Sequence, residues 1–390
     1  MQNQVNNGGK LEPLVQPTDA LSDSQLQRYS RHLVIPGFGE EAQRRLANAR
    51  VLVIGAGGLG SPVLMYLAAA GVGTIGIVDD DTVDVSNLQR QIIHGQGDIG
   101  TLKSSSAARS IAEINPDVTV IEHRELLDNS NAVELFSGYD IILDGTDNFA
   151  TRYLVADAAT LADKPYVWGS ILRFEGQVSL FWDSHGPSYR DLFPEPPLPG
   201  TVPSCADGGV LGVLCGIVGS VMATEAIKAI TGVGKTALGT LMVIDALNLK
   251  WRTLQIEKDP ERAPVSQLGN YEAFCGIDTT TMLPEVSVEE LAELRHRGEP
   301  AIIDVREQSE WDIVHLDDAT LIPRGQIMSG ERDPGALVPA GVEEVYVYCK
   351  GGTRSSEVVR YLRNRGVNAI NVRGGVIDWV EKIEPHKRRY

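Results

Sequence analysis

The chain has 390 residues, 43% of them hydrophobic and 22% charged, a composition typical of folded globular proteins and unlike that of disordered or collagen-like chains. Its formal net charge of −17 disfavours nucleic acid as a partner, because phosphate binding depends on clustered lysine and arginine. The four cysteines include no close pair, so the sequence encodes neither a disulfide framework nor a complete structural zinc site, and a reducing, cytoplasmic location fits best.

The chain begins with a polar stretch and then divides into two domains. Residues 1–20 are expected to be a disordered tail, since the stretch to Pro17 is rich in Asn, Gln, Gly and Pro and carries no export leader. We expect a first domain over 21–260, a linker over 261–285 and a second domain over 286–390, because domains usually have roughly 100–200 residues.

Continuous apolar runs alternate with helical stretches through the first domain. Such runs are typical of strands buried on both faces of a parallel sheet, and the alternation predicts a doubly wound α/β fold. The expected strands are 51–55, 74–79, 118–123, 140–145 and 165–170, with 177–182 and 240–245 extending the sheet. The Pro-rich stretch 191–205 predicts a long functional or mobile loop. The apolar run 210–223 is shorter than the roughly 20 residues of a membrane span, so we expect a buried helix and no membrane association.

A second, smaller α/β series follows the linker. Its expected helices are 287–294 and 355–366, and its expected strands are 301–307, 345–350 and 369–372. A domain of about 105 residues is large enough for a core of its own.

The first candidate site is the glycine-rich turn after the first strand. GAGGLG at 55–60 lies between a strand and a helix, and Asp79 ends the next strand 19 residues after Gly60. This arrangement is the dinucleotide-binding fingerprint, in which glycines let the backbone approach phosphate and the acid holds ribose hydroxyls. It predicts nucleotide binding and leaves both nicotinamide cofactors and ATP open.

Residues further along the chain favour ATP. Asn87, Arg90 and Lys103 supply donors and positive charge, and Asp147 in GTDN supplies a carboxylate. Attack at the α-phosphorus of a triphosphate needs positive charge near the developing oxyanions and a carboxylate to hold Mg²⁺. Hydride transfer needs neither of these.

The GVGKT segment at 232–236 looks at first like a second phosphate-binding motif. A P-loop would need glycine where Ala229 stands, so the segment does not match. We expect it to be a turn that ends a helix.

With these residues in place, the first domain resembles the adenylating enzymes of the ubiquitin-activating superfamily, closest to the molybdopterin-synthase adenylyltransferase branch. The motifs that carry the resemblance are RYSRH at 28–32, GAGGLGSP, VDDDTVDVSNLQRQ, TDN and the PSC…GG crossover. The resemblance implies a Rossmann-like adenylation domain that uses ATP and Mg²⁺. The residues that it places at the nucleotide are Gly55, Gly57, Gly58, Gly60, Asp79, Asn87, Arg90, Lys103 and, as the Mg²⁺ ligand, Asp147. It also implies catalytic roles for Arg90 and Lys103, and a homodimer in which Arg31 reaches the site of the partner subunit.

The second candidate site is CKGGTR at 349–354, which follows an apolar strand and precedes a helix. The backbone N–H groups of such a loop, the helix N-terminus and Arg354 together form an anion nest that favours a thiolate at Cys349. A phosphatase loop would need Cys-x5-Arg, one residue more than the Cys-x4-Arg found here, so the spacing favours sulfur chemistry.

Residues 286–390 resemble a rhodanese sulfurtransferase domain. The resemblance is carried by AIIDVRE at 301–307, EWDIVHLDDA at 310–319, the six-residue cysteine loop and GGVIDW at 374–379. It implies that Cys349 carries a persulfide, with Arg354 in a supporting role.

The remaining cysteines separate by position. Cys215 lies inside the apolar run and is expected to be a core residue. Cys205 lies in the Pro-rich loop and, by the resemblance, matches a cysteine that can bond transiently to the sulfur carrier.

In the resembled adenylating family, two CxxC pairs hold a zinc ion. The four corresponding positions here are Ser188, Asp191, Glu272 and Cys275. Only one thiolate of four remains, whereas a tetrahedral thiolate site needs the full set, so we expect no structural zinc, while an Asp/Glu/Cys metal site of lower affinity stays open.

Together the two resemblances imply an adenylyltransferase fused to a sulfurtransferase. The first domain would adenylate the C-terminal Gly-Gly carboxylate of a small ubiquitin-like sulfur carrier protein. The Cys349 persulfide, loaded by a cysteine desulfurase or by thiosulfate, would then give a thiocarboxylate for molybdopterin or related cofactor synthesis. Two alternatives stay open: a nicotinamide-dependent oxidoreductase with a regulatory rhodanese-like domain, and a non-catalytic scaffold that docks sulfur carriers.

Overall fold

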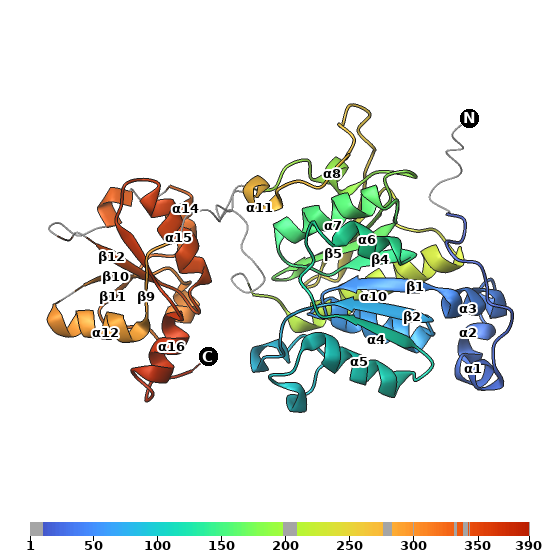
Figure 1. Cartoon of the computed structure of the whole chain (residues 1–390), viewed down its shortest axis with the longest axis horizontal. Helices are drawn as coiled ribbons and strands as arrows, with labels where there is room; N and C mark the ends of the chain where they lie inside the picture. The colour runs from blue at the N-terminus through green and yellow to red at the C-terminus, as the bar shows by residue number, and fades with distance from the viewer. Residues whose placement is uncertain are drawn as a thin grey trace. The chain divides into compact units, whose positions relative to one another are not determined.

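The computed structural model of the protein describes residues 11–197, 209–275, 283–298, 300–330, 334–337, 342 and 344–389. The chain forms two compact units, and the main division between them falls after Cys275 (Figure 1). That division lies within the stretch 261–285 that the sequence assigned to a linker.

The first unit is built on one mixed sheet. Its strands are β1 (Arg50–Ile54), β2 (Thr74–Val78), β3 (Thr119–His123), β4 (Ile141–Asp144), β5 (Tyr166–Leu172), β6 (Glu175–Phe181), β7 (Thr240–Asp245) and β8 (Lys250–Gln255). Its helices are α1 (Asp23–Arg28), α2 (Ser30–Leu33), α3 (Gly39–Asn48), α4 (Gly60–Ala70), α5 (Lys103–Ile114), α6 (Ala132–Ser137), α7 (Phe149–Leu161), α8 (Tyr189–Leu192), α10 (Gly212–Thr231) and α11 (Tyr271–Phe274), with 3₁₀ turns η1 (Val85–Asn87) and η2 (Gln96–Asp98). Every strand expected from the sequence is present, and β8, whose residues are all exposed, is an addition.

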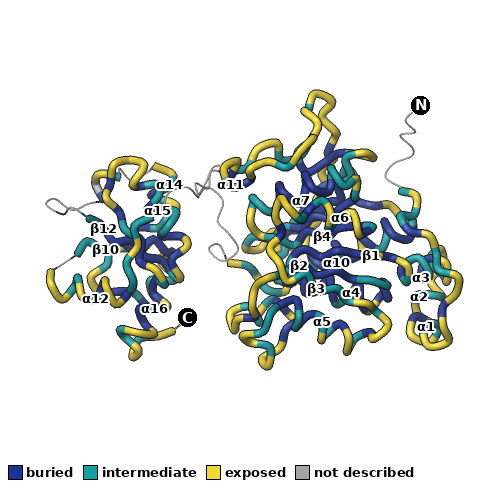
Figure 2. Tube along the Cα trace, viewed as in Figure 1, coloured by how far each residue is buried: buried dark blue, intermediate teal, exposed yellow. Residues whose placement is uncertain are grey.

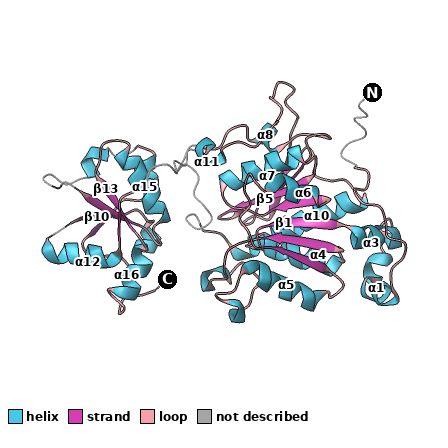
Figure 3. Cartoon of the chain, viewed as in Figure 1, coloured by secondary structure: helices cyan, strands magenta, loops and turns pink. Residues whose placement is uncertain are grey.

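The strand order in the first unit is β3-β2-β1-β4-β5-β6-β7-β8. Strands β3, β2, β1, β4 and β5 pair in parallel, and β6, β7 and β8 each pair antiparallel with the strand before them in this order. The parallel part confirms the expected doubly wound sheet. The core on one face includes side chains of α3, α4, α5 and α10, and the core on the other includes side chains of α6, α7 and α8 (Figure 3). From β1 the sheet is extended in one direction by β2 and β3 and in the other by β4 and β5, so the chain changes direction across the sheet between β1 and β4. In such sheets a ligand usually binds in the crevice beyond the carboxyl ends of the two strands at this point.

Helix α10 is the expected buried helix, and it continues to Thr231. Among the described residues it is the one helix long and apolar enough to cross a membrane, but 56% of its most apolar window is buried inside the unit. A Cβ at Gly219 would lie 2.4 Å from Pro62 Cγ, so the missing side chain lets α10 pack closely on α4. The helix ends at Gly232, whose φ of 71° is left-handed, and the GVGKT segment is therefore the helix-ending turn predicted for it.

The expectation of a disordered tail is wrong for residues 11–20. Val15 is 6% exposed and belongs to the core of the first unit, and the Leu14 amide donates to the Ala229 carbonyl oxygen at 3.1 Å. The prediction of disorder rested on the polar composition of the stretch and gave no weight to these two apolar residues. Both side chains pack in or against the core of the first unit, and this burial stabilises the segment. Residues 1–10 lie outside the described residues.

The second unit has a parallel sheet of its own. Its strands are β9 (Glu285–Val286), β10 (Ala301–Asp304), β11 (Ala319–Leu321), β12 (Val345–Tyr348) and β13 (Ala369–Val372), in the order β11-β10-β12-β13-β9. Its helices are α12 (Val288–Arg297), α13 (Gln308–Trp311), α14 (Arg324–Met328), α15 (Thr353–Arg363) and α16 (Gly375–Lys382), with a 3₁₀ turn η3 (Pro334–Leu337). One core includes α14 and α15 and a second includes α12 and α16, and Figure 2 shows the central strands of both units buried. This is the smaller α/β domain that the sequence predicted.

Candidate functional site

A cavity of about 370 Å³ lies at the carboxyl ends of β1 and β4. The predicted residues that line it are Gly55, Gly57, Gly58, Asp79, Asn87, Arg90, Lys103 and Asp147. Residues separated by up to 92 positions in the sequence thus meet in one place, as the resemblance implied. Of the predicted set, Gly60 and Arg31 are not among the lining residues of the described part of the chain.

The glycine turn connects β1 to α4. Gly55 has a φ of 89°, which is left-handed and favours glycine, and its amide donates to the Val78 carbonyl oxygen at 2.8 Å. A Cβ at Gly60 would lie only 1.9 Å from the Gly55 carbonyl oxygen, so glycine is required there by close packing of the helix on the turn. Gly60 therefore shapes the site without facing the cavity.

Asp79 directly follows the last residue of β2 and anchors the glycine turn. Its Oδ2 accepts from the Ala56 amide at 2.7 Å, and its Oδ1 accepts from the Asp81 amide at 3.0 Å. Burial raises the pKa of Asp79, while the Ala56 hydrogen bond and the nearby Lys103 charge oppose that rise. The carboxylate thus fixes the distance between two loops that both border the cavity.

The positive groups come from the segment between η1 and α5. Lys103 is the first residue of α5, its side chain is 9% exposed, and its Nζ lies 2.9 Å from Asp81 Oδ2. Arg90 donates from Nη1 to the Ser86 carbonyl oxygen at 3.0 Å. Both cations are held at the cavity by short contacts, where an anionic ligand would meet them.

Asp147 is exposed and lies three residues beyond the end of β4. Behind it, Asp144 is fully buried, and its Oδ1 accepts from the Thr146 amide at 3.0 Å and from the Thr146 hydroxyl at 2.7 Å. Burial raises the pKa of Asp144 to about 6. Asp144 therefore shapes the turn that presents Asp147 at the cavity.

The sequence analysis missed two buried residues that line the cavity. Gln91 is 4% exposed, and its Oε1 has no hydrogen-bond partner among the residues that the structure describes. Arg152 is 7% exposed and donates from Nη2 to the Thr146 carbonyl oxygen at 3.1 Å. Gln91 belongs to the SNLQRQ motif beside Arg90, which was the available signal. A buried acceptor without a partner in a cavity wall suits a polar ligand.

The lining residues fit ATP with Mg²⁺. The glycine turn allows close approach of phosphates, and Asp147 offers an exposed carboxylate. Gln91 Oε1, which accepts no hydrogen bond from the described residues, is available to accept one from a ligand. Within the described ranges, no three His, Cys, Asp or Glu side chains gather where they could hold a metal ion. Mg²⁺ is commonly held by one or two carboxylates together with substrate phosphates, so a single carboxylate is compatible with it.

The cysteine loop of the second unit follows β12. Cys349 is 1% exposed, its Sγ accepts from the Gly352 amide at 3.1 Å, and the Ser355 hydroxyl lies 3.5 Å from it. Ser355 Oγ lies closer to Asn371 Oδ1, at 2.6 Å. Gly352 has a φ of 105° and caps α15, so the helix N-terminus faces the sulfur as the sequence predicted.

Two backbone amides of helix α16 donate hydrogen bonds to carbonyl oxygens of the cysteine loop. The Val376 amide donates to the Cys349 carbonyl oxygen at 2.9 Å, and the Ile377 amide donates to the Lys350 carbonyl oxygen at 3.1 Å. A Cβ at Gly375 would lie 2.4 Å from the first of these oxygens and 2.5 Å from the second. Gly375, the second glycine of GGVIDW, is thus required for the close approach of α16 to the carbonyl groups of the loop.

Arg354 lies at the start of α15, and its guanidinium group forms a bidentate ion pair with Glu310. The Nη1–Oε2 and Nη2–Oε1 distances are both 2.7 Å. The sequence analysis assigned Arg354 to the anion nest but did not identify Glu310, which is 44 residues away along the chain.

At three of the four positions at which the resembled family holds zinc, Ser188, Asp191 and Cys275, the described side chains do not favour a zinc ion. Asp191 already accepts from Arg262 Nε at 2.8 Å and from the Ser188 amide at 2.7 Å. Cys275 is 7% exposed, and burial raises the pKa of its thiol, which disfavours the thiolate that zinc requires. The side chain of Glu272 is outside the described part of the structure.

The other two cysteines have different outcomes. Cys215 is fully buried in α10, as expected for a core residue. Cys205 lies outside the described residues, and its assignment as an intermediate thiol stays a prediction.

The family matches cover most of the chain. Residues 29–265 match the ThiF family, and residues 287–382 match the rhodanese-like domain. The chain is 54% identical over 391 residues to the probable adenylyltransferase/sulfurtransferase MoeZ of Mycobacterium tuberculosis (strain H37Rv), and the match covers 97% of this chain and 99% of that protein. It is 39% identical over 401 residues to the adenylyltransferase and sulfurtransferase MOCS3 of Sus scrofa, covering 94% of this chain and 88% of that protein.

Solved structures resemble the first unit in fold. Escherichia coli MccB with MccA-N7isoASN superposes with a TM-score of 0.56 and 21% identity, over 61% of this chain and 74% of that chain. PaaA superposes with a TM-score of 0.54 and 20% identity, over 66% of this chain and 79% of that chain.

Proposed function

The chain belongs to the ThiF family and, with its rhodanese-like domain, to the adenylyltransferase/sulfurtransferase enzymes, and from this premise we propose the reactions of its two sites. The first unit adenylates the C-terminal glycine of a small ubiquitin-like sulfur carrier protein with ATP. The second unit supplies sulfur from a persulfide on Cys349, and the carrier leaves as a thiocarboxylate for molybdopterin or a related cofactor. One observation carries the proposal: a single chain holds both sites. These are the cavity lined by Lys103 and Asp147 and the cysteine loop in which the Gly352 amide donates a hydrogen bond to Cys349 Sγ.

The two alternatives find no support among the relatives. MoeZ and MOCS3 are both named for an adenylyltransferase and a sulfurtransferase activity, and neither is an oxidoreductase or a scaffold by name. The identity of 54% over nearly the whole chain makes a change of reaction class an unnecessary assumption.

In the adenylation step, a carboxylate oxygen of the carrier attacks the α-phosphorus of ATP, and the bond to the bridging oxygen of pyrophosphate breaks. Asn87 and Arg90 bind the phosphates, and Lys103 moves from Asp81 Oδ2 toward the oxygens that gain charge. Asp147 is the protein ligand of Mg²⁺, which when bound neutralises phosphate charge. The product is an acyl-adenylate whose AMP is a good leaving group.

In the sulfur step, the terminal sulfur of the Cys349 persulfide attacks the acyl carbon and AMP leaves. The carrier is then joined to the enzyme through an acyl disulfide. A second thiolate, assigned here to Cys205, attacks Cys349 Sγ, so that the thiocarboxylate leaves with the bonding electron pair and a Cys205–Cys349 disulfide forms. A dithiol reductant returns both cysteines to thiols.

The same proposal includes the assembly and location of the protein. We assign a homodimer, in which the exposed Arg31 of α2 contributes to the site of the partner subunit. The negative net charge and the scarce cysteines support a cytoplasmic enzyme without a nucleic-acid or membrane partner. The sulfur donor is a cysteine desulfurase or thiosulfate.

The test separates the two half-reactions by mutation. Lys103→Ala and Asp147→Ala should lower carrier-dependent ATP–pyrophosphate exchange at least about 100-fold, because both residues act on charge that develops in the transition state. Cys349→Ala should leave this exchange unchanged and abolish the carrier thiocarboxylate, which is detected as replacement of one oxygen by sulfur in the carrier mass. The matched control is Lys235→Ala, since Lys235 is the exposed lysine of the GVGKT turn.

Two results would contradict the proposal. Near-normal exchange in Asp147→Ala would remove the Mg²⁺ role from that carboxylate. Loss of exchange in Lys235→Ala would place the phosphates at the end of α10 instead of at the glycine turn.

A further inference from the structure

Strand β10 of the second unit ends in a fully buried ion pair. Arg306 and Asp304 are both 0% exposed, and Arg306 Nε lies 2.9 Å from Asp304 Oδ1. Arg306 also donates from Nη2 to the Val314 carbonyl oxygen at 2.7 Å. Because a buried charge is stable only when it is paired, these contacts fix the loop 305–314 to the end of the strand.

The loop fixed in this way carries the short helix α13 and its Glu310. On the side toward residue 315, the indole of Trp311 stacks on the His315 ring with 3.9 Å between centroids and 6° between planes. His315 Nδ1 also lies 2.9 Å from the Trp311 carbonyl oxygen. The Arg306–Val314 hydrogen bond and the Trp311–His315 stack restrict the loop on either side of Glu310, and Glu310 Oε2 accepts from the Glu307 amide at 3.2 Å.

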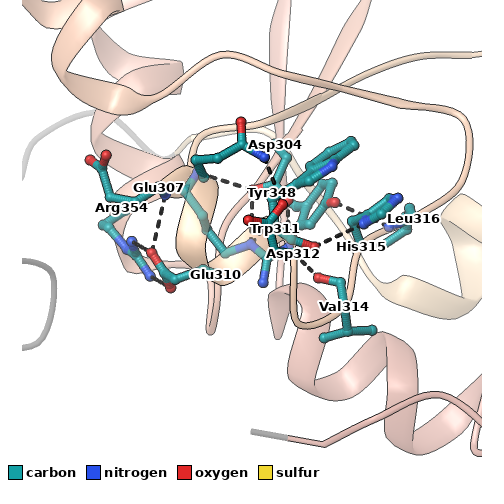
Figure 4. A network of polar contacts seen from close by, with 12 residues as sticks. Asp304, Glu307, Glu310, Trp311, Asp312, Val314, His315, Leu316, Tyr348 and Arg354 are labelled. Carbon is teal, nitrogen blue, oxygen red and sulfur yellow. Dashed lines mark hydrogen bonds and ion pairs between the residues drawn. The ribbon is translucent and has the colours of Figure 1, made fainter.

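Glu310 is directed at Arg354. The two distances of 2.7 Å join both carboxylate oxygens to both terminal nitrogens of the guanidinium group, and the side chains are 17% and 8% exposed (Figure 4). Arg354 begins the helix that caps the cysteine loop and lies five residues after Cys349. A bidentate, charge-assisted ion pair of this geometry is strong. It places the Glu310 carboxylate next to the positive charge of Arg354 and so offsets that charge at the loop.

The pair does not serve to hold the backbone of the loop. That task falls to the amides of Val376 and Ile377 on the Cys349 and Lys350 carbonyl oxygens. A change at Glu310 should therefore act on charge at the loop while Cys349 keeps its place.

We propose that Glu310 is a specificity-determining residue of the sulfur site, which acts by positioning and neutralising Arg354. The inference rests on the proposed function of Cys349 as the sulfur acceptor. When thiosulfate is the donor, the Cys349 thiolate attacks the outer sulfur, the S–S bond of thiosulfate breaks, and sulfite leaves with the electron pair. The donor and the leaving group are both dianions, so a neutralised arginine weakens their binding and the loop discriminates against oxyanion donors.

The test uses the full chain in steady-state sulfur transfer from thiosulfate to cyanide. Glu310→Gln removes the negative charge that is paired with Arg354, and we expect the KM for thiosulfate to fall about tenfold, with a smaller change in kcat. Inhibition by inorganic phosphate should become stronger by a similar factor. Glu310→Asp keeps the charge and should leave the KM near that of the wild type, and the matched control Asp312→Asn removes an exposed charge from the same loop.

A double substitution distinguishes action through Arg354 from a general loss of structure. In an Arg354→Gln background, Glu310→Gln should change the KM by less than about twofold, because the ion pair with Arg354 is already absent. The inference is overturned if Glu310→Gln leaves the KM and the phosphate inhibition unchanged, or if Asp312→Asn lowers the KM equally. Failure of the wild-type chain to take up sulfur on Cys349 from any donor would instead refute the proposed function.

Discussion

An ion pair between α7 and α8 offers a direct test of what stabilises the first unit where the resembled family uses zinc. Arg190 Nε and Nη2 lie 2.7 and 2.9 Å from the two oxygens of Asp157, and the Tyr271 hydroxyl donates to Asp157 Oδ2 at 2.8 Å. The Asp157 side chain is 5% exposed. The pair therefore ties α11, at the end of the unit, to two helices that precede it by more than 70 residues.

The perturbation is Arg190→Met. Methionine keeps an apolar stem near the Tyr153 and Phe274 rings, each 5.1 Å from the guanidinium carbon, so the main loss is the charge. Removing one partner of a buried pair costs about 3–5 kcal/mol, and the remaining Tyr271 hydrogen bond favours the lower end. For a unit of this size, about 3 kcal/mol corresponds to a fall in Tm of roughly 6–10 °C.

The assay is thermal unfolding of the full chain followed by calorimetry, with the transition of the first unit identified by its shift on adding ATP. Asp157→Asn/Arg190→Met should recover most of the loss, because no uncompensated charge remains buried. The control is Arg252→Met, since Arg252 and Glu175 are 71% and 51% exposed and 3.8 Å apart, and such pairs contribute at most about 1 kcal/mol. A chelator should leave all of these Tm values unchanged. The reasoning is refuted if Arg190→Met unfolds at the wild-type temperature, or if the double variant is no more stable than the single one.

Three further predictions address metal, pH and the cysteine loop. The purified protein should contain far less than one zinc per chain by elemental analysis, since Asp191 is engaged by Arg262, and stoichiometric zinc that survives a chelator would contradict this. Burial raises the pKa of Asp144 from 3.8 to about 6, so the folded state binds its proton more tightly than the unfolded state, and its contribution to stability is lost as pH rises through this range. The free energy of unfolding of the wild type minus that of Asp144→Asn, from urea titrations, should therefore fall by about 2.4 kcal/mol between pH 4 and 7, and a difference independent of pH would disprove the shift. Gly375→Ala should abolish sulfur transfer while leaving pyrophosphate exchange intact, because the new Cβ would overlap the Cys349 carbonyl oxygen, and a normal rate of transfer would show that the loop tolerates displacement.

Where local spacing encodes chemistry, the sequence was sufficient. A strand, a glycine turn and a helix occupy consecutive residues, so GAGGLG at 55–60 and the cysteine loop at 349–354 could be located before any tertiary structure was considered. Asp79 and Asp147 were assigned to one nucleotide site by the family resemblance, and both line the cavity at the carboxyl ends of the parallel strands. The local motifs thus located both sites, and the resemblance grouped the residues that lie far apart in the chain.

Contacts between distant side chains were decided only by the tertiary structure. Glu310 and Arg354 are 44 residues apart, and Asp157 and Tyr271 are 114 apart, so no periodicity or motif relates them. Composition likewise suggested a disordered tail up to residue 20, but a single side chain such as Val15 contributes by the area that it buries against a surface formed elsewhere in the chain. The sequence by itself determined which residues end the strands and carry the chemistry, and the packing of helices onto the sheets decided which charges those residues meet.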